Sequence, residues 1–194
     1  MFPGDAAESI EFGRLVLLNE EPGNTESMFI GECLRVLKRA GIVGVVSFSD
    51  PIPRWNGEEL VLRGHVGVVY QATNALYLGR ATPRTLHTFA DGTVVSARTE
   101  QKIHAKERGW KHAVEQLVER GASAPPDGDE ALLSWLRAWK ARLTTRSRHG
   151  GNLKYVFPLG GKAVERHVRR VATVKRYPKA ERGLDGALLR IIEA

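Results

Sequence analysis

The sequence has almost no cysteine and no long apolar run, and each shortage excludes a class of protein. Cys33 is the one cysteine among 194 residues, which excludes an internal disulfide and a cysteine-cage metal site. No apolar run approaches the ~18 residues that a membrane-spanning helix needs. The residues after Met1 lack the basic and apolar segments of a signal peptide, so we expect a cytoplasmic protein with no membrane partner.

Positive charge is present but unevenly distributed. The chain has 29 Lys and Arg against 22 Asp and Glu, a net charge of +7. Thirteen of the basic residues and two of the acidic ones lie between Lys140 and Arg182, which leaves 16 basic and 20 acidic residues elsewhere. A basic end on a mildly acidic body is typical of a chain that meets a polyanion, and a solvated surface or flexible tail is the plainer interpretation.

Residues 13–48 predict a strand, a helix and a second strand. Leu15-Val16-Leu17-Leu18 and Ile42-Val43-Gly44-Val45-Val46 are unbroken apolar runs, and apolar residues recur at helical spacing between them. Because strands that are apolar on both faces are covered on both sides, we expect these two to lie parallel, joined by the helix. Asn24 or Thr25 is expected to start the helix and Gly41 to end it.

The remaining elements follow from turns and periodicity. Asp91-Gly92 is a favoured turn between β-type segments at 85–89 and 93–98, which predicts a hairpin. Apolar spacing predicts helices over 110–120 and 129–143, and residues 154–157 predict a late strand. Residues 64–72 fit a strand and a helical face equally well.

Two loops beside the expected parallel strands could carry chemistry. The loop before the first helix would present free amides and the positive helix end to a phosphate, although a plain helix cap explains it as well and Glu26 would oppose an anion. Asp50 follows the second strand, where open α/β sheets bind ligands, so it is a candidate base or orienting group. The alternative for Asp50 is an ordinary Asp-Pro turn.

Hydrogen-bonding and aromatic side chains cluster downstream. The cluster comprises His65, Tyr70, Asn74, Tyr77 and Arg80. Such residues could bind a planar polar substrate, and the tyrosines could equally be core aromatics. The six histidines include no close liganding pair on one helix face, so no metal site is predicted.

Several segments, taken in order, carry a resemblance to a known family. They include Gly23-Asn24-Thr25-Glu26-Ser27 before a helix, Tyr77-Leu78-Gly79-Arg80, and Lys154-Tyr155-Val156-Phe157-Pro158-Leu159. The most specific part is Ser47-x-x-Asp50-Pro51 followed by Gly64-His65-x-Gly67-x-x-Tyr70-x-Ala72-x-Asn74. Over residues 14–159 the chain resembles the phage-encoded Mom family, which converts the N6 of adenine in DNA to a carbamoylmethyl form and so protects phage DNA from restriction.

The resemblance implies a fold, a cofactor and site residues. It implies a mixed α/β core similar to GNAT acyltransferases, in which residues 64–74 are helical. Arg14, Ser27, Asp50 and Tyr70 take the positions of the family's functional residues. Gly23, Asn24, Thr25 and Ser27 would hold acetyl-CoA or another acyl-CoA, and an iron requirement is not readable from the sequence.

The partner expected from this resemblance is double-stranded DNA. Phosphates would be held by basic side chains and the target base by polar ones. The residues expected to contact DNA are His65, Asn74, Tyr77, Arg80, Arg146, Arg148, Lys154, Arg166, Arg169 and Arg170. The alternatives are a GNAT-like acyltransferase acting on a small-molecule or protein amine, and a non-catalytic DNA-binding phage accessory protein.

The chain departs from the family pattern in two places. Residues 52–63 form an insertion between Asp50-Pro51 and Gly64-His65. The amino-terminal half is shorter than the family's, from which we expect a homodimer or a partner chain that supplies the missing half. We expect a GNAT-like domain over 1–160, with a helical segment 101–143 inserted before its last strand, and a basic carboxy-terminal extension over 161–194.

Overall fold

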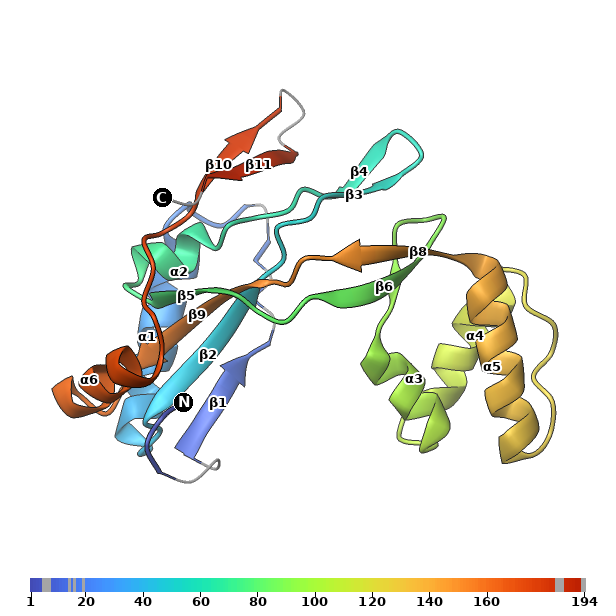
Figure 1. Ribbon diagram of the computed structural model, residues 1–194, viewed down its shortest axis with the longest axis horizontal. Coiled ribbons are helices and arrows are strands. Elements are labelled where there is room, and N and C mark those ends of the chain that lie inside the picture. Colours follow the sequence, from blue (N-terminus) through green and yellow to red (C-terminus); the bar gives the residue numbers. More distant parts are fainter. Residues whose placement is uncertain (5–7, 14, 16, 19, 184–186, 193–194) are drawn as a thin grey trace. The chain divides into compact units, whose positions relative to one another are not determined.

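The computed structural model describes residues 1–4, 8–13, 15, 17–18, 20–183 and 187–192 (Figure 1). Six helices and several small sheets make these residues a mixed α/β protein. The chain divides into two compact units: unit 1 comprises residues 1–53, 63–83 and 150–194, and unit 2 comprises residues 54–62 and 84–149.

Unit 1 contains a four-stranded sheet. Its strands, in spatial order, are β1 (Ser9–Phe12), β2 (Gly44–Ser49), β9 (Leu153–Pro158) and β5 (Leu76–Arg80). β1 and β2 are parallel, and β9 is antiparallel to both β2 and β5. The late strand predicted over 154–157 is therefore confirmed, and it is one of the two inner strands of the sheet.

The first strand corrects the sequence prediction. The strand expected at Leu15-Leu18 lies instead at Ser9–Phe12, where Ser9 pairs with Gly44 and Phe12 with Ser47. Leu15 and Leu17 lie outside regular structure, and Leu18 is 69% exposed. An apolar run was misleading here because the strand that pairs with β2 alternates polar and apolar residues over only four positions.

Helices cover both faces of this sheet. α1 (Thr25–Arg39) begins after Asn24 and ends before Gly41, as predicted, and connects the two parallel strands. Ile30 of α1 and Tyr70 of α2 (Val68–Ala72) pack with Val45, Tyr155 and Phe157 in one core cluster. Alternation along β9 turns Val156 to the opposite face, where α6 (Lys162–Val171) contacts the strand (Figure 1).

The last segment of the chain belongs to unit 1. After α6, strands β10 (Lys179–Arg182) and β11 (Leu188–Ile192) form an antiparallel hairpin whose Ala180 and Ile191 pack on the same core cluster. The segment after residue 160 is thus grouped with unit 1.

Unit 2 has its own sheet and its own core. β6 (Arg84–Phe89) lies between β7 (Val94–Val95) and β8 (Thr144–His149), and β3 (Arg54–Asn56) pairs with β4 (Glu59–Leu62) in a separate hairpin. The expected insertion 52–63 thus contains a hairpin. Helices α3 (Ala97–His104), α4 (Trp110–Glu119) and α5 (Asp129–Leu143) enclose a core around Ile103, Leu117 and Trp135.

Two features of unit 2 differ from the sequence prediction. The second strand of the 85–98 hairpin ends at Val95, because the Ser96 hydroxyl accepts a hydrogen bond from the Thr99 amide and caps α3. Strand β8 was not predicted, since Thr-Thr-Arg-Ser-Arg-His has no apolar alternation. Its pairing with β6 along six residues makes it a strand.

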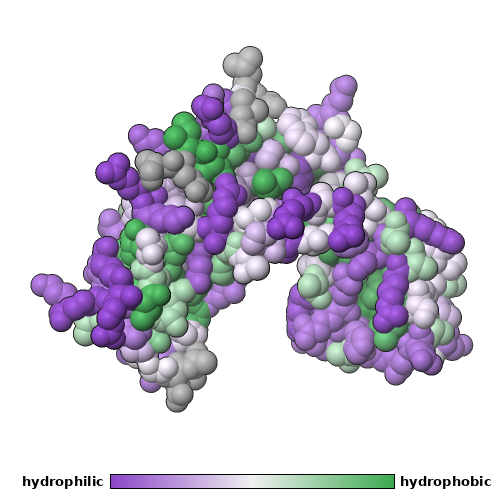
Figure 2. All heavy atoms as spheres, in the orientation of Figure 1, coloured by the Kyte–Doolittle hydropathy of each residue, from purple (hydrophilic) through white to green (hydrophobic). Residues whose placement is uncertain are grey.

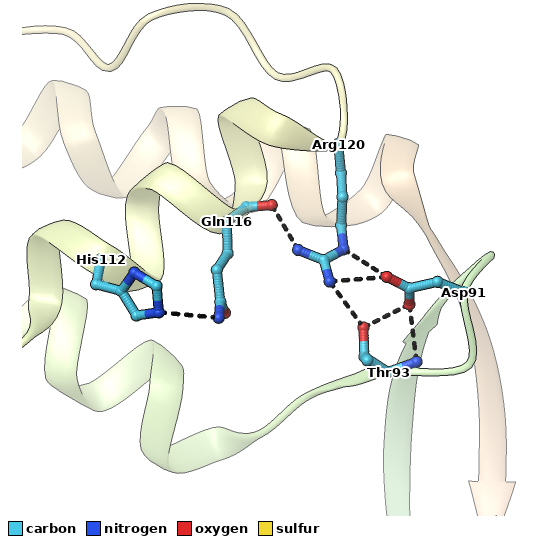
Figure 3. A network of polar contacts seen from close by, with 5 residues as sticks. All are labelled: Asp91, Thr93, His112, Gln116 and Arg120. Carbon is cyan, nitrogen blue, oxygen red and sulfur yellow. Dashed lines mark hydrogen bonds and ion pairs between the residues drawn. The ribbon is translucent and has the colours of Figure 1, made fainter. Parts of the chain in front are cut away.

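A polar network fixes the predicted Asp91-Gly92 turn to α4 (Figure 3). The Arg120 guanidinium donates to Asp91 Oδ2 over 2.7 Å from Nη2 and 2.9 Å from Nε, and to the Gln116 carbonyl over 2.8 Å. Burial would raise the pKa of Asp91, but hydrogen bonds from Thr93 and Arg120 outweigh it and hold that pKa below its usual value. These polar residues stabilise the fold of unit 2.

In the part of the chain that the structure describes, no helix is long and apolar enough to cross a membrane.

Candidate functional site

The main pocket of unit 1 lies where the two parallel strands end. Gly13 follows β1, Phe48 is near the end of β2, and Glu26 is in the first turn of the helix that connects them. The pocket has a volume of about 460 Å³. Its walls are Gly13, Leu15, Glu26, Phe48, His65, Val68, Val69, Tyr70 and Arg182. This is the edge of the sheet at which the sequence predicted a ligand site.

Close backbone packing explains the Asp50-Pro51 and Gly64-His65 pairs of the sequence motif. Gly64 has a φ of +68°, and a Cβ there would lie 2.6 Å from the Pro51 carbonyl oxygen. The His65 amide donates to the Asp50 carbonyl over 3.0 Å. The insertion between these pairs therefore leaves Asp50 and His65 adjacent, as the motif requires.

A second glycine allows α2 to approach the sheet. Gly67 has a φ of +70°, and a Cβ there would lie 2.7 Å from Tyr155 and 2.9 Å from Tyr70. The Tyr155 hydroxyl donates to the Val66 carbonyl, and Gln71 Nε2 donates to the same carbonyl over 2.9 Å. Residues 66–71 are thereby held against β9, which positions Tyr70.

Tyr70 stands between the core and the pocket. Its ring lies 5.4 Å from that of Tyr155 and meets Phe157 edge-on at 6.3 Å. Burial raises the pKa of Tyr70, and the Glu26 carboxylate acts in the same direction against the nearby Ser47 hydroxyl. The phenol therefore stays protonated at neutral pH and can donate a hydrogen bond.

Two buried hydroxyls lie on the side of β2 that faces α2. Ser47 and Ser49 are fully buried, and among the described residues neither Oγ has a partner in hydrogen-bond geometry, although Ser47 lies near enough to Tyr70 to lower the pKa of that phenol. Buried hydroxyls without partners are uncommon in folded proteins and are stabilised when a ligand or water bonds them.

Three charged side chains, those of Asp50, Arg182 and Glu26, act on His65. Burial lowers the pKa of His65, and Arg182 acts in the same direction, whereas the carboxylates of Asp50 and Glu26 oppose them. A lowered pKa keeps the imidazole neutral near pH 7, and a neutral imidazole can accept a proton.

Asp50 is half-buried and adjoins the pocket without lining it. Its Oδ1 accepts a hydrogen bond from the Ile52 amide over 3.0 Å, which makes the Asp-Pro turn named as the alternative interpretation. The structure therefore shows a turn, together with a carboxylate whose charge acts on His65.

The residues at the start of α1 differ in exposure and in whether they line the pocket. Gly23 and Asn24 are exposed, Thr25 is half-buried, and the Ser27 hydroxyl donates to the Asn24 carbonyl over 2.9 Å. None of these four lines the pocket, whereas Glu26 does. Arg14, the fourth residue implied by the family resemblance, lies outside the described residues.

The side chains expected to contact a base are not all at the surface. Tyr77, one of the residues expected to contact DNA, is 1% exposed and its ring lies 5.2 Å from that of Tyr155, so this ring is part of the core. Asn74 is exposed and has a φ of 62°, a backbone conformation that asparagine tolerates after a short helix. Arg80 is exposed at the end of β5.

Basic side chains occur on both units. On α6, Arg166, His167 and Arg170 line a surface hollow of about 260 Å³, and hydrophilic side chains gather over this helix (Figure 2). Arg169 is paired with Glu165 over 2.9 Å, and Lys154 is half-buried in β9. On unit 2, Arg146 and Arg148 are exposed on one face of β8.

The structure also reveals pocket residues that sequence reasoning missed. From the sequence, Glu26 is a charge at the helix start that would oppose an anion, and Arg182 is one of thirteen basic residues. No sequence signal identifies Arg182, because its position depends on how the β10–β11 hairpin packs. Within the described ranges, no group of three His, Cys, Asp or Glu residues could hold a metal ion.

One comparison with known proteins gives a match. The model of the Mom protein family matches residues 3–179 of the chain. No curated protein and no solved structure matches the chain.

Proposed function

This chain belongs to the Mom protein family, and we propose that it is a DNA-modification enzyme of phage origin that converts the N6 of adenine to a carbamoylmethyl-type derivative, acting in the host cytoplasm and protecting DNA from restriction. The observation that carries this proposal is the pocket in which the motif residues His65 and Tyr70 meet at the end of the parallel strands. Phe48, which lies between Ser47 and Asp50 in the sequence, lines the same pocket.

The pocket suits a planar base with polar edges. Leu15, Phe48 and Val69 provide apolar walls, and Tyr70 provides a hydroxyl donor. The N6 of adenine is buried in the stack of a duplex, so an enzyme that acts on it must take the base out of the helix. Burial in such a pocket offsets part of the free energy lost when the base unstacks.

The pocket also supplies a proton acceptor. The N6 amino group is a weak nucleophile because its lone pair is delocalised into the ring, so a base that removes a proton from N6 would help this nitrogen to react. The neutral His65 imidazole can accept this proton, and the Asp50 carboxylate stabilises the imidazolium that results. Tyr70 orients the base through its hydroxyl.

We propose that acetyl-CoA or another acyl-CoA binds at the start of α1, in a core that is similar to GNAT acyltransferases. Asn24 makes no side-chain cap and the Thr25 amide donates to the Pro22 carbonyl over 2.9 Å, so the amides of Glu26 and Ser27 are the donors that would meet a phosphate. Gly23, Asn24, Thr25 and Ser27 would hold the pyrophosphate. Glu26, which faces the pocket, would repel it, and this sets the side of the helix on which the cofactor can lie.

The basic surfaces would hold the DNA backbone. Arg166 and Arg170 share a hollow on α6, and an exposed arginine is suited to bidentate contact with a phosphate. Arg169, Lys154, Arg146, Arg148 and Arg80 are the other candidate phosphate contacts, and Asn74 is an exposed candidate for a base contact. Contacts of this kind give affinity without sequence information.

The decisive experiment is mass spectrometry of nucleosides from cells that express the protein. Wild-type protein should convert part of the deoxyadenosine to a heavier N6-substituted nucleoside and make plasmid DNA resistant to some restriction enzymes. The variants Tyr70→Phe and Asp50→Ala should each abolish the product while the protein remains folded. Val171→Ala, at an exposed position of α6, is the matched control. Unaltered nucleosides from soluble wild-type protein would overturn the proposal.

A further inference from the structure

The β10–β11 hairpin is docked on unit 1 through several contacts. Ala180, Leu188 and Ile191 pack on the core cluster that contains Tyr70. The Leu188 amide donates to the Arg63 carbonyl over 2.9 Å, and Arg190 pairs with Glu181 over 2.8 Å within the hairpin. The hairpin is therefore part of the folded unit and can position a side chain.

One side chain of this hairpin reaches the pocket. Arg182 lines the pocket with Glu26, His65 and Tyr70, and its Nη1 donates to the Gly64 carbonyl over 3.3 Å. The family model matches residues 3–179, so Arg182 and all of β11 lie outside the matched range. One wall of the pocket therefore comes from a segment to which the family match does not extend.

The chemistry of this wall differs from that of the rest of the pocket. Among the described residues that line the pocket, Arg182 is the one with a permanent positive charge. It is exposed, whereas Tyr70 beside the core is only 9% exposed. A guanidinium has five N–H donors and can hold a phosphate while it keeps other partners. A ligand with a flat apolar part and an attached phosphate matches this arrangement.

We propose that Arg182 binds the phosphate adjoining the base that the pocket receives, so that the β10–β11 hairpin selects a nucleotide of DNA as substrate. This inference rests on the function proposed above. The chemical feature recognised is a phosphate group, and coenzyme A also carries phosphates, so the test separates these two sources.

The test compares Arg182→Gln with Arg190→Gln, a control from the same hairpin that does not line the pocket. Affinity for duplex DNA is measured against salt concentration, and binding of coenzyme A by thermal shift. One lost phosphate contact should reduce the log-log salt slope by about 0.9 in Arg182→Gln alone. Loss of a charge-assisted hydrogen bond should lower modified deoxyadenosine in cells about tenfold or more.

Each result has a defined meaning. An unchanged salt slope with a lost coenzyme A shift would overturn the DNA assignment and make the cofactor the source of the phosphate. Unchanged behaviour in both assays would overturn the proposal as a whole. If Arg182→Gln loses thermal stability, Arg182→Lys, which keeps the charge, should restore the salt slope. A reduced slope with no modified nucleoside from the wild type would retain the phosphate contact and reject the enzymatic function.

Discussion

At the scale of single residues, the pocket depends on Gly67, a position at which the structure leaves no room for a side chain. Gly67 has a positive φ, and a Cβ there would lie 2.7 Å from the Tyr155 ring. We expect Gly67→Ala to lower the free energy of unfolding by about 2–4 kcal/mol, because overpacking adds to the cost of the left-handed backbone. Chemical denaturation measures this loss.

A second glycine separates the cost of overpacking from the cost of the left-handed backbone. Gly41 also has a positive φ, of +84°, but nothing lies within 4 Å of its Cβ position. Gly41→Ala should therefore lose only about 1–2 kcal/mol. Equal losses in the two variants would show that Gly67 is required for its backbone conformation alone, and that the approach of α2 to β9 has room for a methyl group.

His65 should make both stability and activity depend on pH. Burial and the Arg182 charge hold its pKa in the folded protein below the usual 6.5. The unfolded chain then binds a proton more readily, so the contribution of His65 to stability is complete above pH 6.5 and is lost as the pH falls through the folded-state pKa. The stability of His65→Gln relative to the wild type should therefore increase as the pH is lowered from about 8 to about 5.

Activity gives an independent measurement of the same group. If the neutral imidazole accepts the N6 proton, the acid limb of the modification rate should lie below pH 6.5. A limb above that value would indicate that another group is the base. A stability difference between wild type and His65→Gln that does not change with pH would show that solvent screens the imidazole.

At the scale of secondary-structure elements, the sequence predicted those elements whose ends are marked by caps and turns close by in the chain. α1 was found with its bounds because Asn24, the basic last turn and Gly41 mark them. The 85–89 strand and its turn were found for the same reason. β8 and the true position of β1 were missed, because each becomes a strand through pairing with a partner distant in sequence.

The residues of the candidate site also divide into those that the sequence identified and those that only tertiary packing reveals. The motif around Asp50, His65 and Tyr70 was recognised through the resemblance to a known family, because residues 64–72 by themselves fit a strand and a helical face equally well. Tyr77 could not be distinguished from a surface aromatic until its partner Tyr155 was known. Arg182 enters the pocket only through the packing of a hairpin, for which no local pattern exists.

α6 allows a test of DNA contact on one element. Its apolar Val164 and Val168 are buried, while Arg166 and Arg170 line an exposed hollow. Replacing both arginines with Gln should reduce the log-log salt slope of duplex binding by about 1.8, which corresponds to two phosphates. Arg35→Gln on α1, where Arg35 pairs with Glu32 over 2.8 Å, is the control. An unchanged slope in the double variant would identify this face as ordinary solvated surface.

At the scale of the whole molecule, the two units have separate cores although the chain passes between them several times. Leu153 and Tyr155 belong to the core cluster of unit 1, and Leu117 and Trp135 to that of unit 2. Each core should therefore respond to its own mutations. Proteins open in cooperative units that coincide with such clusters.

Hydrogen exchange tests this independence. Leu117 is 2% exposed, so Leu117→Ala should create a cavity that costs about 2–5 kcal/mol and removes amide protection from the helices of residues 97–143. Residues 153–158 should keep their protection in that variant. Leu153→Ala, at a fully buried position of β9, should produce the opposite pattern and also weaken the pocket, because β9 carries the Tyr155 ring on which Tyr70 rests. Loss of protection in both units from either variant would show that the cores unfold together, and that unit 2 contributes to the stability of the site.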